Sequence, residues 1–324
     1  MAHLNSTNVP TRAAARDHAL LVRASRLYYE LGETQEKIAE RLGVTRAHVS
    51  KLLKRARATG VVEIRIVDEL DEVPAVGDAL RERFGLRAVH LAASGDGTAD
   101  VTRRRVGRLA AQVLAATVRA GMVVGIGDGA TVSATADGLE PALSPLDATV
   151  VPLCGGYWHS GAGREPFRRV ADAFGAGIHG LLAPGLLDDA PTRDALRGHA
   201  GVRAVADLWD GLDVALLGIG GPAWSEATVG AVAFRELEAR RAIGEVLIAP
   251  FDIDGQFVGD ELRSRTIAFD ARQLARVPVA IGVAEGPAKV APILGALRAG
   301  AVNILVTDVR TAEAIDSLDR VAAA

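Results

Sequence analysis

The chain has 324 residues, of which 49% are apolar and 24% are charged, so it has the length and the apolar content for two globular domains. No apolar run approaches the roughly 20 residues that a membrane-spanning helix needs, and the sequence predicts no membrane association. The single cysteine, Cys154, excludes an intrachain disulfide and argues against a metal site built from cysteines. We therefore expect a cytoplasmic protein that holds no metal and no cofactor.

The net charge of −3 hides an uneven distribution of charge along the chain. Residues 1–67 contain twelve Lys and Arg against six Asp and Glu, whereas the remaining residues contain 25 against 34. A basic first part on an acidic body is expected when only the first part meets phosphate groups. The charge pattern predicts that residues 1–67 bind nucleic acid and that the body does not bind it nonspecifically.

The sequence indicates four segments. Residues 1–16 are polar and are expected to form a flexible arm, not a signal peptide. Residues 17–67 are expected to form a winged helix-turn-helix domain, with a first helix over 13–31. Residues 68–85 are predicted to be an acidic, partly helical linker. Residues 86–324 are predicted to form one effector-binding and oligomerisation domain.

Residues 34–55 have the pattern of a helix-turn-helix. Thr34 is suited to cap the first helix and Thr45 the second, since their hydroxyls accept hydrogen bonds from first-turn amides. Gly43 is suited to end the first helix, because glycine adopts the left-handed conformation at the lowest cost. The apolar residues that repeat with helical spacing, and so form the faces that pack together, are Ile38, Ala39, Leu42, Val49, Leu52 and Leu53.

The outward face of the second helix is polar and basic, and such a face enters the major groove of DNA. Residues 60–67 alternate with period two, which predicts a strand-like wing. The alternative is an ordinary amphipathic helical hairpin, which needs neither the basic face nor the wing. The predicted DNA-binding residues are Thr34, Gln35, Thr45, Arg46, Ala47, Ser50, Lys51, Lys54 and Arg55.

From residue 87 onward, short apolar runs alternate with helical segments. The runs are rich in β-branched residues and continuously apolar, as in strands buried on both faces of a parallel sheet. Their alternation with helices predicts a doubly wound α/β domain. The predicted strands cover residues 88–92, 122–126, 148–153, 214–219, 246–251, 277–283 and 303–306, and the helices between them cover residues 100–120, 167–174, 233–243 and 289–299.

The ends of several predicted strands are rich in glycine and polar residues. Ligands of such sheets lie beyond the carboxyl ends of the strands, and glycines there let backbone amides approach an anion. The pattern lacks the third glycine of a dinucleotide fingerprint and the ending of a P-loop. We therefore expect a polyol or phosphate cleft. The predicted effector-binding residues are Gly127, Asp128, Gly129, Thr131, Gly155, Gly156, Gly218, Gly220, Asp252, Glu285 and Lys289.

Three of these assignments have plain structural alternatives. A single Gly-x-Gly more often marks a tight turn than a ligand loop, and Asp252 can equally be a turn residue ahead of Asp254-Gly255. Lys289 is the one lysine of the acidic body, in which every other basic residue is arginine. A compact ammonium group beside a Gly-rich turn suits an anionic or hydroxylated ligand group, although one lysine can also arise by chance.

The chain resembles the SorC family of bacterial sugar-responsive transcriptional regulators over nearly its whole length. The resemblance rests on residues 24–66 in the first domain and, in the body, on residues 124–131, Ala183-Pro184-Gly185, residues 213–220, Lys289 and residues 305–308. It implies an effector domain similar in fold to ribose-5-phosphate isomerase and glucosamine-6-phosphate deaminase, used for sensing. It also implies dimers or tetramers on palindromic operators, with a phosphate-contacting loop at 127–131 and the family's later lysine at Lys289.

Two departures from the family pattern bear on the ligand. Family members commonly have Trp-Gly-Arg-Thr in the first loop, where this chain has Asp128-Gly129-Ala130-Thr131. Some phosphate-sensing members have an arginine before the double glycine of the second loop, where this chain has Cys154. The loss of these cations favours a neutral sugar or polyol, and an anion held by Lys289 and backbone amides remains the alternative.

The sequence thus predicts a DNA-binding transcriptional regulator controlled by a sugar, polyol or sugar phosphate. One alternative is a sugar-phosphate isomerase or deaminase with an accessory DNA-binding head, in which Asp252, Glu285 and Lys289 serve as base, acid and electrophile. A second is a constitutive DNA-binding protein whose body only oligomerises. Double-stranded operator DNA, a small-molecule effector and further copies of the chain are the expected partners.

Overall fold

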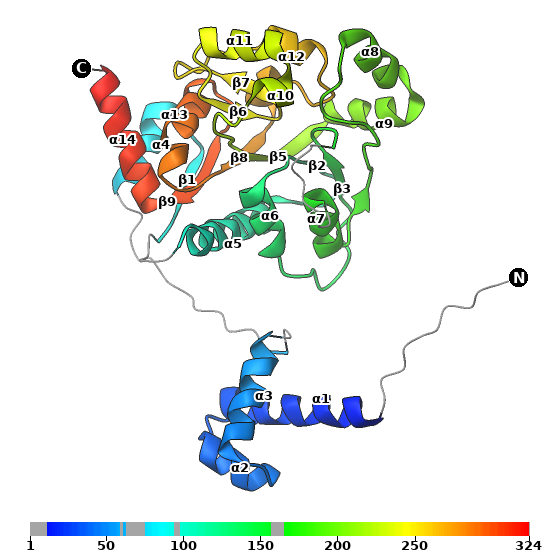
Figure 1. Ribbon diagram of the computed structural model, residues 1–324, viewed down its shortest axis with the longest axis vertical. Coiled ribbons are helices and arrows are strands. Elements are labelled where there is room, and N and C mark those ends of the chain that lie inside the picture. Colours follow the sequence, from blue (N-terminus) through cyan, green and yellow to red (C-terminus); the bar gives the residue numbers. More distant parts are fainter. Residues whose placement is uncertain (1–11, 59–60, 63–74, 94–97, 157–164, 324) are drawn as a thin grey trace, which may run out of the picture. The chain divides into compact units, whose positions relative to one another are not determined.

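The computed structural model describes residues 12–58, 61–62, 75–93, 98–156 and 165–323 (Figure 1). The chain divides into two compact units, Met1–Glu69 and Leu70–Ala324. Among the described helices, none combines the length and the apolar character needed to cross a membrane. We describe each unit by itself.

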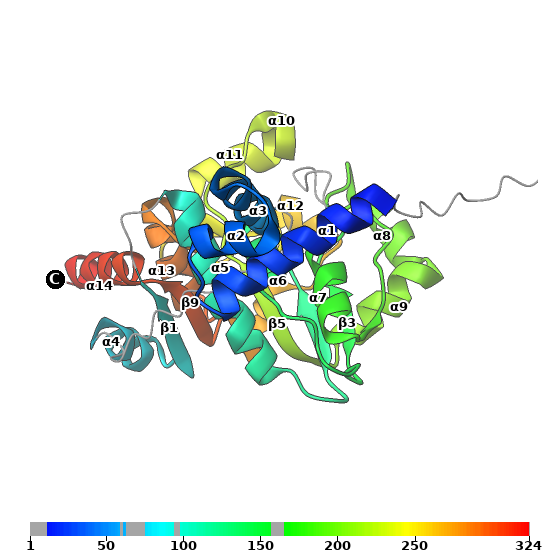
Figure 2. The same ribbon diagram turned by 90° about the horizontal axis from the view of Figure 1, so that it is seen from below.

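The first unit is a bundle of α1 (Arg12–Ser25), the short π-helix η1 (Arg26–Glu30), α2 (Gln35–Leu42) and α3 (Arg46–Ala58). Both α1 and α2 pack against α3 (Figure 2). The predicted single helix over 13–31 is therefore interrupted at residue 26. Of the predicted wing, only residues 61 and 62 lie within the described residues, in a bend that packs on the core of the bundle.

The starts of α2 and α3 and the turn between them have the predicted hydrogen bonds and backbone conformation. The Thr34 hydroxyl accepts from the amide of Lys37 at 3.4 Å, and the Thr45 hydroxyl accepts from the amide of His48 at 3.2 Å. Gly43 has a φ of 66°, in the left-handed region that favours glycine. The predicted caps and the predicted helix end are thus confirmed. Ile38, Ala39, Val49, Leu52 and Leu53 are all buried between the helices.

The second unit is built on a seven-stranded parallel sheet of order β1-β9-β8-β5-β2-β3-β4 (Figure 1). Its strands are β1 (Ala88–Ala92), β2 (Val123–Ile126), β3 (Thr149–Pro152), β4 (Gly177–Ile178), β5 (Leu212–Gly218), β8 (Val279–Val283) and β9 (Ile304–Asp308). Six predicted strands correspond to these: the bounds of β1 are as predicted, and the ends of the other five differ by at most two residues. The sequence pattern does not predict β4, which has two exposed residues at the edge.

Helices cover both faces of the sheet, as predicted. On one face lie α5 (Ala99–Thr117), α6 (Ala130–Asp137) and α7 (Pro166–Phe174), and on the other lie α4 (Ala75–Phe84), α9 (Ala200–Trp209), α13 (Val290–Arg298) and α14 (Val309–Ala323). Successive residues of β5 show why its run is continuously apolar. Val214 and Leu216 pack in the core between the sheet and α5, α6 and α7, whereas Ala215 and Leu217 pack in the core on the opposite face.

The prediction of a sheet strand over 246–251 is wrong. The segment forms a separate antiparallel hairpin of β6 (Gly244–Val246) and β7 (Ala249–Phe251), joined by Leu247 and Ile248. An apolar run of this length shows burial but does not show the direction of the chain. The remaining elements around the sheet are α8 (Ala190–Gly198), α10 (Glu226–Val229), α11 (Ala231–Ala239), α12 (Asp260–Ser264), η2 (Ala271–Arg276) and η3 (Pro287–Lys289).

Helix α4 lies within the range predicted as a linker and packs into the second unit. Leu80 is completely buried in one of the two cores. Arg83 contacts Asp316 at 2.9 Å and Asp319 at 3.3 Å on α14, and Asp319 also accepts from Arg298 of α13 at 2.7 Å. Charged groups therefore join α4, α13 and α14 to one another.

We predict that Asp319→Ala lowers the free energy of unfolding of the second unit by about 2–3 kcal/mol, because it leaves two partly buried arginines without their shared carboxylate. Urea unfolding of the full chain, followed by circular dichroism, measures the change. Asp254→Ala is the matched control, since it removes an exposed partner 3.6 Å from the same Arg298. That control should cost less than about 1 kcal/mol. Equal losses in the two variants would contradict the prediction.

Candidate functional site

A cavity of about 800 Å³ opens at the carboxyl ends of β2, β5 and β8. The strand order changes direction between β2 and β5, since β3 and β4 follow β2 outward on one side and β5 lies on its other side. Ligands of open α/β sheets bind at such a switch point. The volume lies in the range of about 300–1,000 Å³ found for small-molecule sites, so the cavity can hold one sugar-sized ligand.

Glu285, which follows β8, is held by two neighbours on different helices. Its Oε1 accepts from Arg103 Nε of α5 at 3.0 Å, and its Oε2 accepts from the Thr131 hydroxyl of α6 at 2.7 Å. The side chain of Glu285 is only 9% exposed, so water competes weakly with these bonds. Thr131 and Glu285, which are both predicted to bind the effector, therefore also bind each other.

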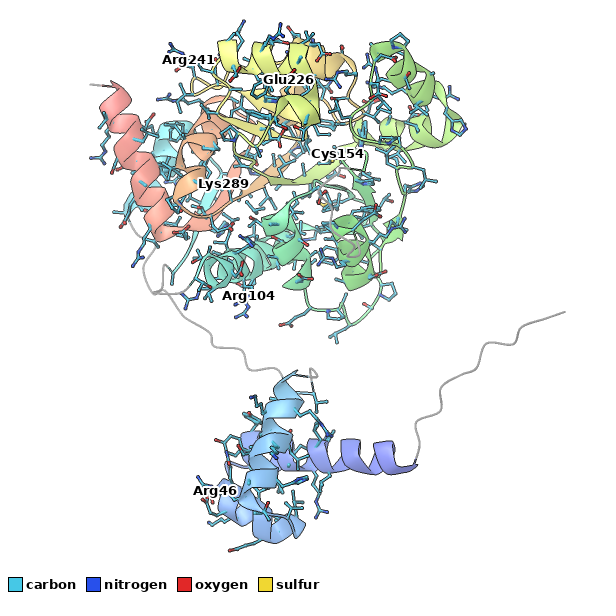
Figure 3. The ribbon with its side chains drawn as sticks, viewed as in Figure 1. Arg46, Arg104, Cys154, Glu226, Arg241 and Lys289 are labelled. Carbon is cyan, nitrogen blue, oxygen red and sulfur yellow. The ribbon has the colours of Figure 1, made fainter. Side chains whose placement is uncertain are left out.

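Lys289 ends the short helix η3 and lies half-buried at the cavity (Figure 3). Burial lowers the pKa of its ammonium group, and the positive charge of Arg103 adds to the lowering. The negative charges of Glu285 and Glu245 oppose both effects. Lys289 is thus a cation placed among acceptors, in a position to donate hydrogen bonds into the cavity.

Seven of the eleven predicted effector-binding residues line this cavity: Asp128, Gly129, Thr131, Gly218, Gly220, Glu285 and Lys289. Gly127, Gly155 and Gly156 line a smaller adjoining hollow, which shares Asp128 and Cys154 with the main cavity. Asp252 lines neither. Its Oδ1 accepts from the amides of Asp254 at 3.1 Å and Gln256 at 2.8 Å, which is the turn role given above as its alternative.

The glycine amides do not serve the predicted purpose of meeting an anion. Gly127, Gly155, Gly156 and Gly220 all donate their amides to backbone carbonyls, at 2.8–3.0 Å. The amide of Gly129 donates to the carboxylate of Asp128 at 2.8 Å. Packing explains Gly155, since a Cβ there would lie 2.5 Å from the carbonyl oxygen of Ala183. Among these loops, glycine therefore mainly allows close approach of neighbouring chain segments.

The sequence pattern misses four charged residues at the cavity, namely Arg103, Glu165, Arg169 and Glu245. Arg169 of α7 donates to the Ser133 hydroxyl and to Asp137. The two arginines correct the expectation that the cleft has lost its cations, because helices α5 and α7 supply them. Of the four missed residues, only Glu245 has a recognisable signal in the sequence, because it is an acid within the apolar run 243–251. Its Oε2 accepts from Trp224 Nε1 at 3.1 Å.

The predicted DNA-binding face lies on the surface of the first unit. Eight of its nine residues are exposed, and Gln35 is partly buried. Arg46 Nε lies 2.8 Å from Glu36 Oε1 of α2, with both side chains largely exposed (Figure 3). Such an exposed pair is weak and can open to let the arginine reach a base or phosphate.

A helix-turn-helix on one unit and a polar, sugar-sized cavity at the switch point of the other define an effector-binding transcriptional regulator. The family model of the sugar-binding domain matches residues 69–315, and that of sigma-70 region 4 matches residues 26–59. The chain belongs to the SorC family of sugar-binding transcriptional regulators.

Several relatives are similar over most of their length. The sorbitol operon regulator of Klebsiella pneumoniae is 30% identical over 92% of this chain and 97% of its own. The deoxyribonucleoside regulator of Bacillus subtilis is 29% identical over 91% of this chain and 96% of its own. The crystal structure of the full-length Klebsiella sorbitol operon regulator aligns with a TM-score of 0.68, at 30% identity over 92% of this chain and 98% of that chain.

Cys154 lines the cavity, and the charged residues of the cavity wall affect the pKa of its thiol (Figure 3). Burial raises the pKa of its thiol to about 12, with further increases from the negative charges of Asp128 and Glu245. A raised pKa keeps the group as a thiol at neutral pH, and the thiolate is the reactive form.

We predict that the native protein reacts with a thiol-directed reagent at pH 8 about a hundredfold more slowly than free cysteine, whose pKa is about 8.5, because the smaller thiolate fraction outweighs the greater nucleophilicity of a thiolate of higher pKa. Because the chain has one cysteine, the colour released by an aromatic disulfide reagent measures this single site. Glu245→Gln removes one of the charges that raise the pKa and should increase the rate. The urea-unfolded chain is the control for intrinsic reactivity. A native rate within tenfold of the unfolded rate would contradict the prediction.

Proposed function

We propose that the chain is a transcriptional regulator whose operator binding is controlled by an uncharged polyol or sugar in the cavity of the second unit. The observation that carries the choice of an uncharged ligand is the charge of the cavity wall. Four carboxylates line it, from Asp128, Glu165, Glu245 and Glu285, against the three cations Arg103, Arg169 and Lys289.

Two of these cations already have partners. Arg103 donates to Glu285 and to Asp100, and Arg169 donates to Ser133 and Asp137. A phosphate would have to compete with the carboxylates already bound to these arginines and would lie close to four negative charges, whereas hydroxyl groups donate to carboxylates without charge repulsion. The engaged glycine amides further reduce the donors available to an anion.

The names of relatives support a hydroxylated ligand. One is the sorbitol operon regulator of Klebsiella pneumoniae, and another is the erythritol catabolism regulatory protein of Brucella abortus, 29% identical over 93% of this chain. Both names refer to polyols. We extend this ligand class to the present chain, with Glu245 and Glu285 as acceptors and Lys289 as a donor.

On the DNA side, we propose that α3 enters the major groove with its N-terminal end first. Arg46, Ala47, Ser50 and Lys51 then face the base edges, while Lys54 and Arg55 face the phosphates. A dimer or tetramer presents paired helices of this kind to the two halves of a palindrome, and we propose that the chain acts in such an assembly on double-stranded DNA.

The enzyme alternative loses its proposed catalytic set. Asp252 does not line the cavity that contains Glu285 and Lys289, so the base, acid and electrophile are not brought together. The similar proteins reported above are regulators. The second alternative, a body that only oligomerises, leaves a cavity of about 800 Å³ without a role.

We predict that an uncharged alditol or sugar, at a hundred times its Kd, raises the thermal midpoint of the second unit by about 5 °C or more. Differential scanning fluorimetry of the full chain against alditols, aldoses and their phosphates identifies it. Lys289→Met and Glu285→Gln should abolish the shift, whereas Arg104→Ala, on the exposed side of α5, should keep it. A larger shift with a phosphorylated ligand would overturn the choice of an uncharged effector. If none of the tested ligands raises the thermal midpoint, the result would favour a constitutive DNA-binding protein.

We predict that Arg46→Ala and Arg55→Ala impair DNA binding in different ways. Arg46→Ala should reduce the preference for the operator over random DNA by about 5- to 150-fold, corresponding to roughly 1–3 kcal/mol for one base contact. Arg55→Ala should weaken binding to both DNAs alike and lower the salt dependence by about one ion. Fluorescence anisotropy with operator and scrambled duplexes at several salt concentrations measures both. Equal losses on both DNAs for both variants would refute this division.

A further inference from the structure

The hairpin turn between β6 and β7 has an unusual backbone for its sequence. Leu247 and Ile248 have φ angles of 51° and 62°. Positive φ at both central residues is what a tight two-residue hairpin turn requires, and Asn-Gly or Gly-Gly is the sequence that meets it without strain. A β-branched residue such as isoleucine is a genuine outlier there. Among the described non-glycine residues, only Arg241 shares a positive φ.

The side chains of the turn point inward despite this cost. Leu247 is 9% exposed and Ile248 is 7% exposed, and both line the effector cavity. Residues held in unfavourable backbone conformations persist where the surrounding structure imposes them, commonly at ligand sites. The turn thus carries large apolar side chains at two positions where the backbone conformation by itself favours glycine or asparagine.

Two glycines on other segments make room for these side chains. Leu247 Cδ2 lies 3.3 Å from the position that a Cβ would take on Gly127, at the end of β2. Ile248 Cδ1 lies 2.8 Å from the corresponding position on Gly185. Any larger residue at Gly185 would therefore displace Ile248. The turn and the two glycines fit together, and they place an apolar surface beside the carboxylates and Lys289.

We propose that Leu247 and Ile248 determine which length of effector the cavity accepts. The inference rests on the proposed hydroxylated ligand and adds the element that selects its size. Neither side chain can accept or donate a hydrogen bond, so a hydroxyl group pushed against them would lose its water without a new partner. The polar groups of the cavity hold one part of the ligand, and the turn excludes any further hydroxylated carbon.

The first test measures length preference. Wild type, Leu247→Ala and Ile248→Ala are titrated with glycerol, erythritol, ribitol, sorbitol and a seven-carbon alditol, and with the aldoses of the same lengths, by differential scanning fluorimetry. We expect each alanine variant to bind the next longer ligand at least tenfold more tightly than wild type does, because one carbon in a fitted pocket discriminates by about that factor or more. Val232→Ala on α11, whose side chain is 69% exposed, should leave the preference unchanged.

The second test needs no ligand and compares alanine with glycine at the same positions. Glycine adopts positive φ freely and alanine does not, so Leu247→Gly and Ile248→Gly should unfold at a higher temperature than Leu247→Ala and Ile248→Ala. At the control position Val232, in the first turn of α11, the order should reverse, because alanine is the better helix former. Alanine variants as stable as the glycine variants at 247 and 248 would contradict the backbone strain from which the proposal is argued.

The two tests separate the turn from the ligand class. If a polyol or sugar binds and the alanine variants keep the wild-type length preference, the turn does not select size, although the proposed function stands. If only phosphorylated ligands bind, the uncharged effector is wrong, and the same length comparison is made with the phosphates. Should Leu247→Ala or Ile248→Ala fail to fold, Ile248→Val removes one methylene and must still shift the preference towards the longer ligand.

Discussion

The parallel pairing of the seven strands is the constraint on which the rest of the second unit depends. Parallel neighbours require crossover connections, and these place helices on both faces of the sheet. The central strands are then buried on both faces, which is why residues 214–217 of β5 alternate between the two cores although all four are apolar. Parallel strands also end at one edge, so the segments after β2, β5 and β8 meet there without being close in sequence. The cavity is a consequence of topology before it is a consequence of particular side chains.

The electrostatics of the cavity follow from pairs formed across different elements. Glu285 comes from a strand end, Arg103 from α5 and Thr131 from α6, and each bond between them restricts two segments at once. Internal pairing leaves the wall polar but close to neutral, which suits a ligand rich in hydroxyl groups. The strained turn at Leu247 and Ile248 supplies part of the apolar wall, beside Pro166, Ile219 and Val283. The cavity thus combines fixed acceptors with a surface that accepts no hydroxyl.

The features that could be predicted from sequence are those with a local physical cause. Thr34, Gly43 and Thr45 determine their helix ends through bonds within four residues, and the continuous apolar runs predict strands buried on both faces. The misses all depend on distant parts of the chain. The run 246–251 is buried in a hairpin, whose direction no periodicity encodes. Nothing local shows that Arg103 faces the cavity while Arg104 faces solvent. Four of the predicted loop glycines lie where another segment approaches closely, namely Gly127, Gly155, Gly218 and Gly220.

The loop that carries Glu285 is also bonded to the start of α14, the last helix of the chain. The amide of Gly286 donates to the Thr311 hydroxyl at 2.9 Å and to Asp308 at 3.2 Å, at the first turn of α14. Near the other end of α14, Asp319 bonds to Arg83 of α4, the helix with which the described part of the second unit begins. Helix α14 is therefore bonded near its first turn to the loop that carries Glu285 and near its last turn to α4. A ligand acts on operator binding only through a difference in affinity between two arrangements, and this chain of contacts is where such a difference can be expressed.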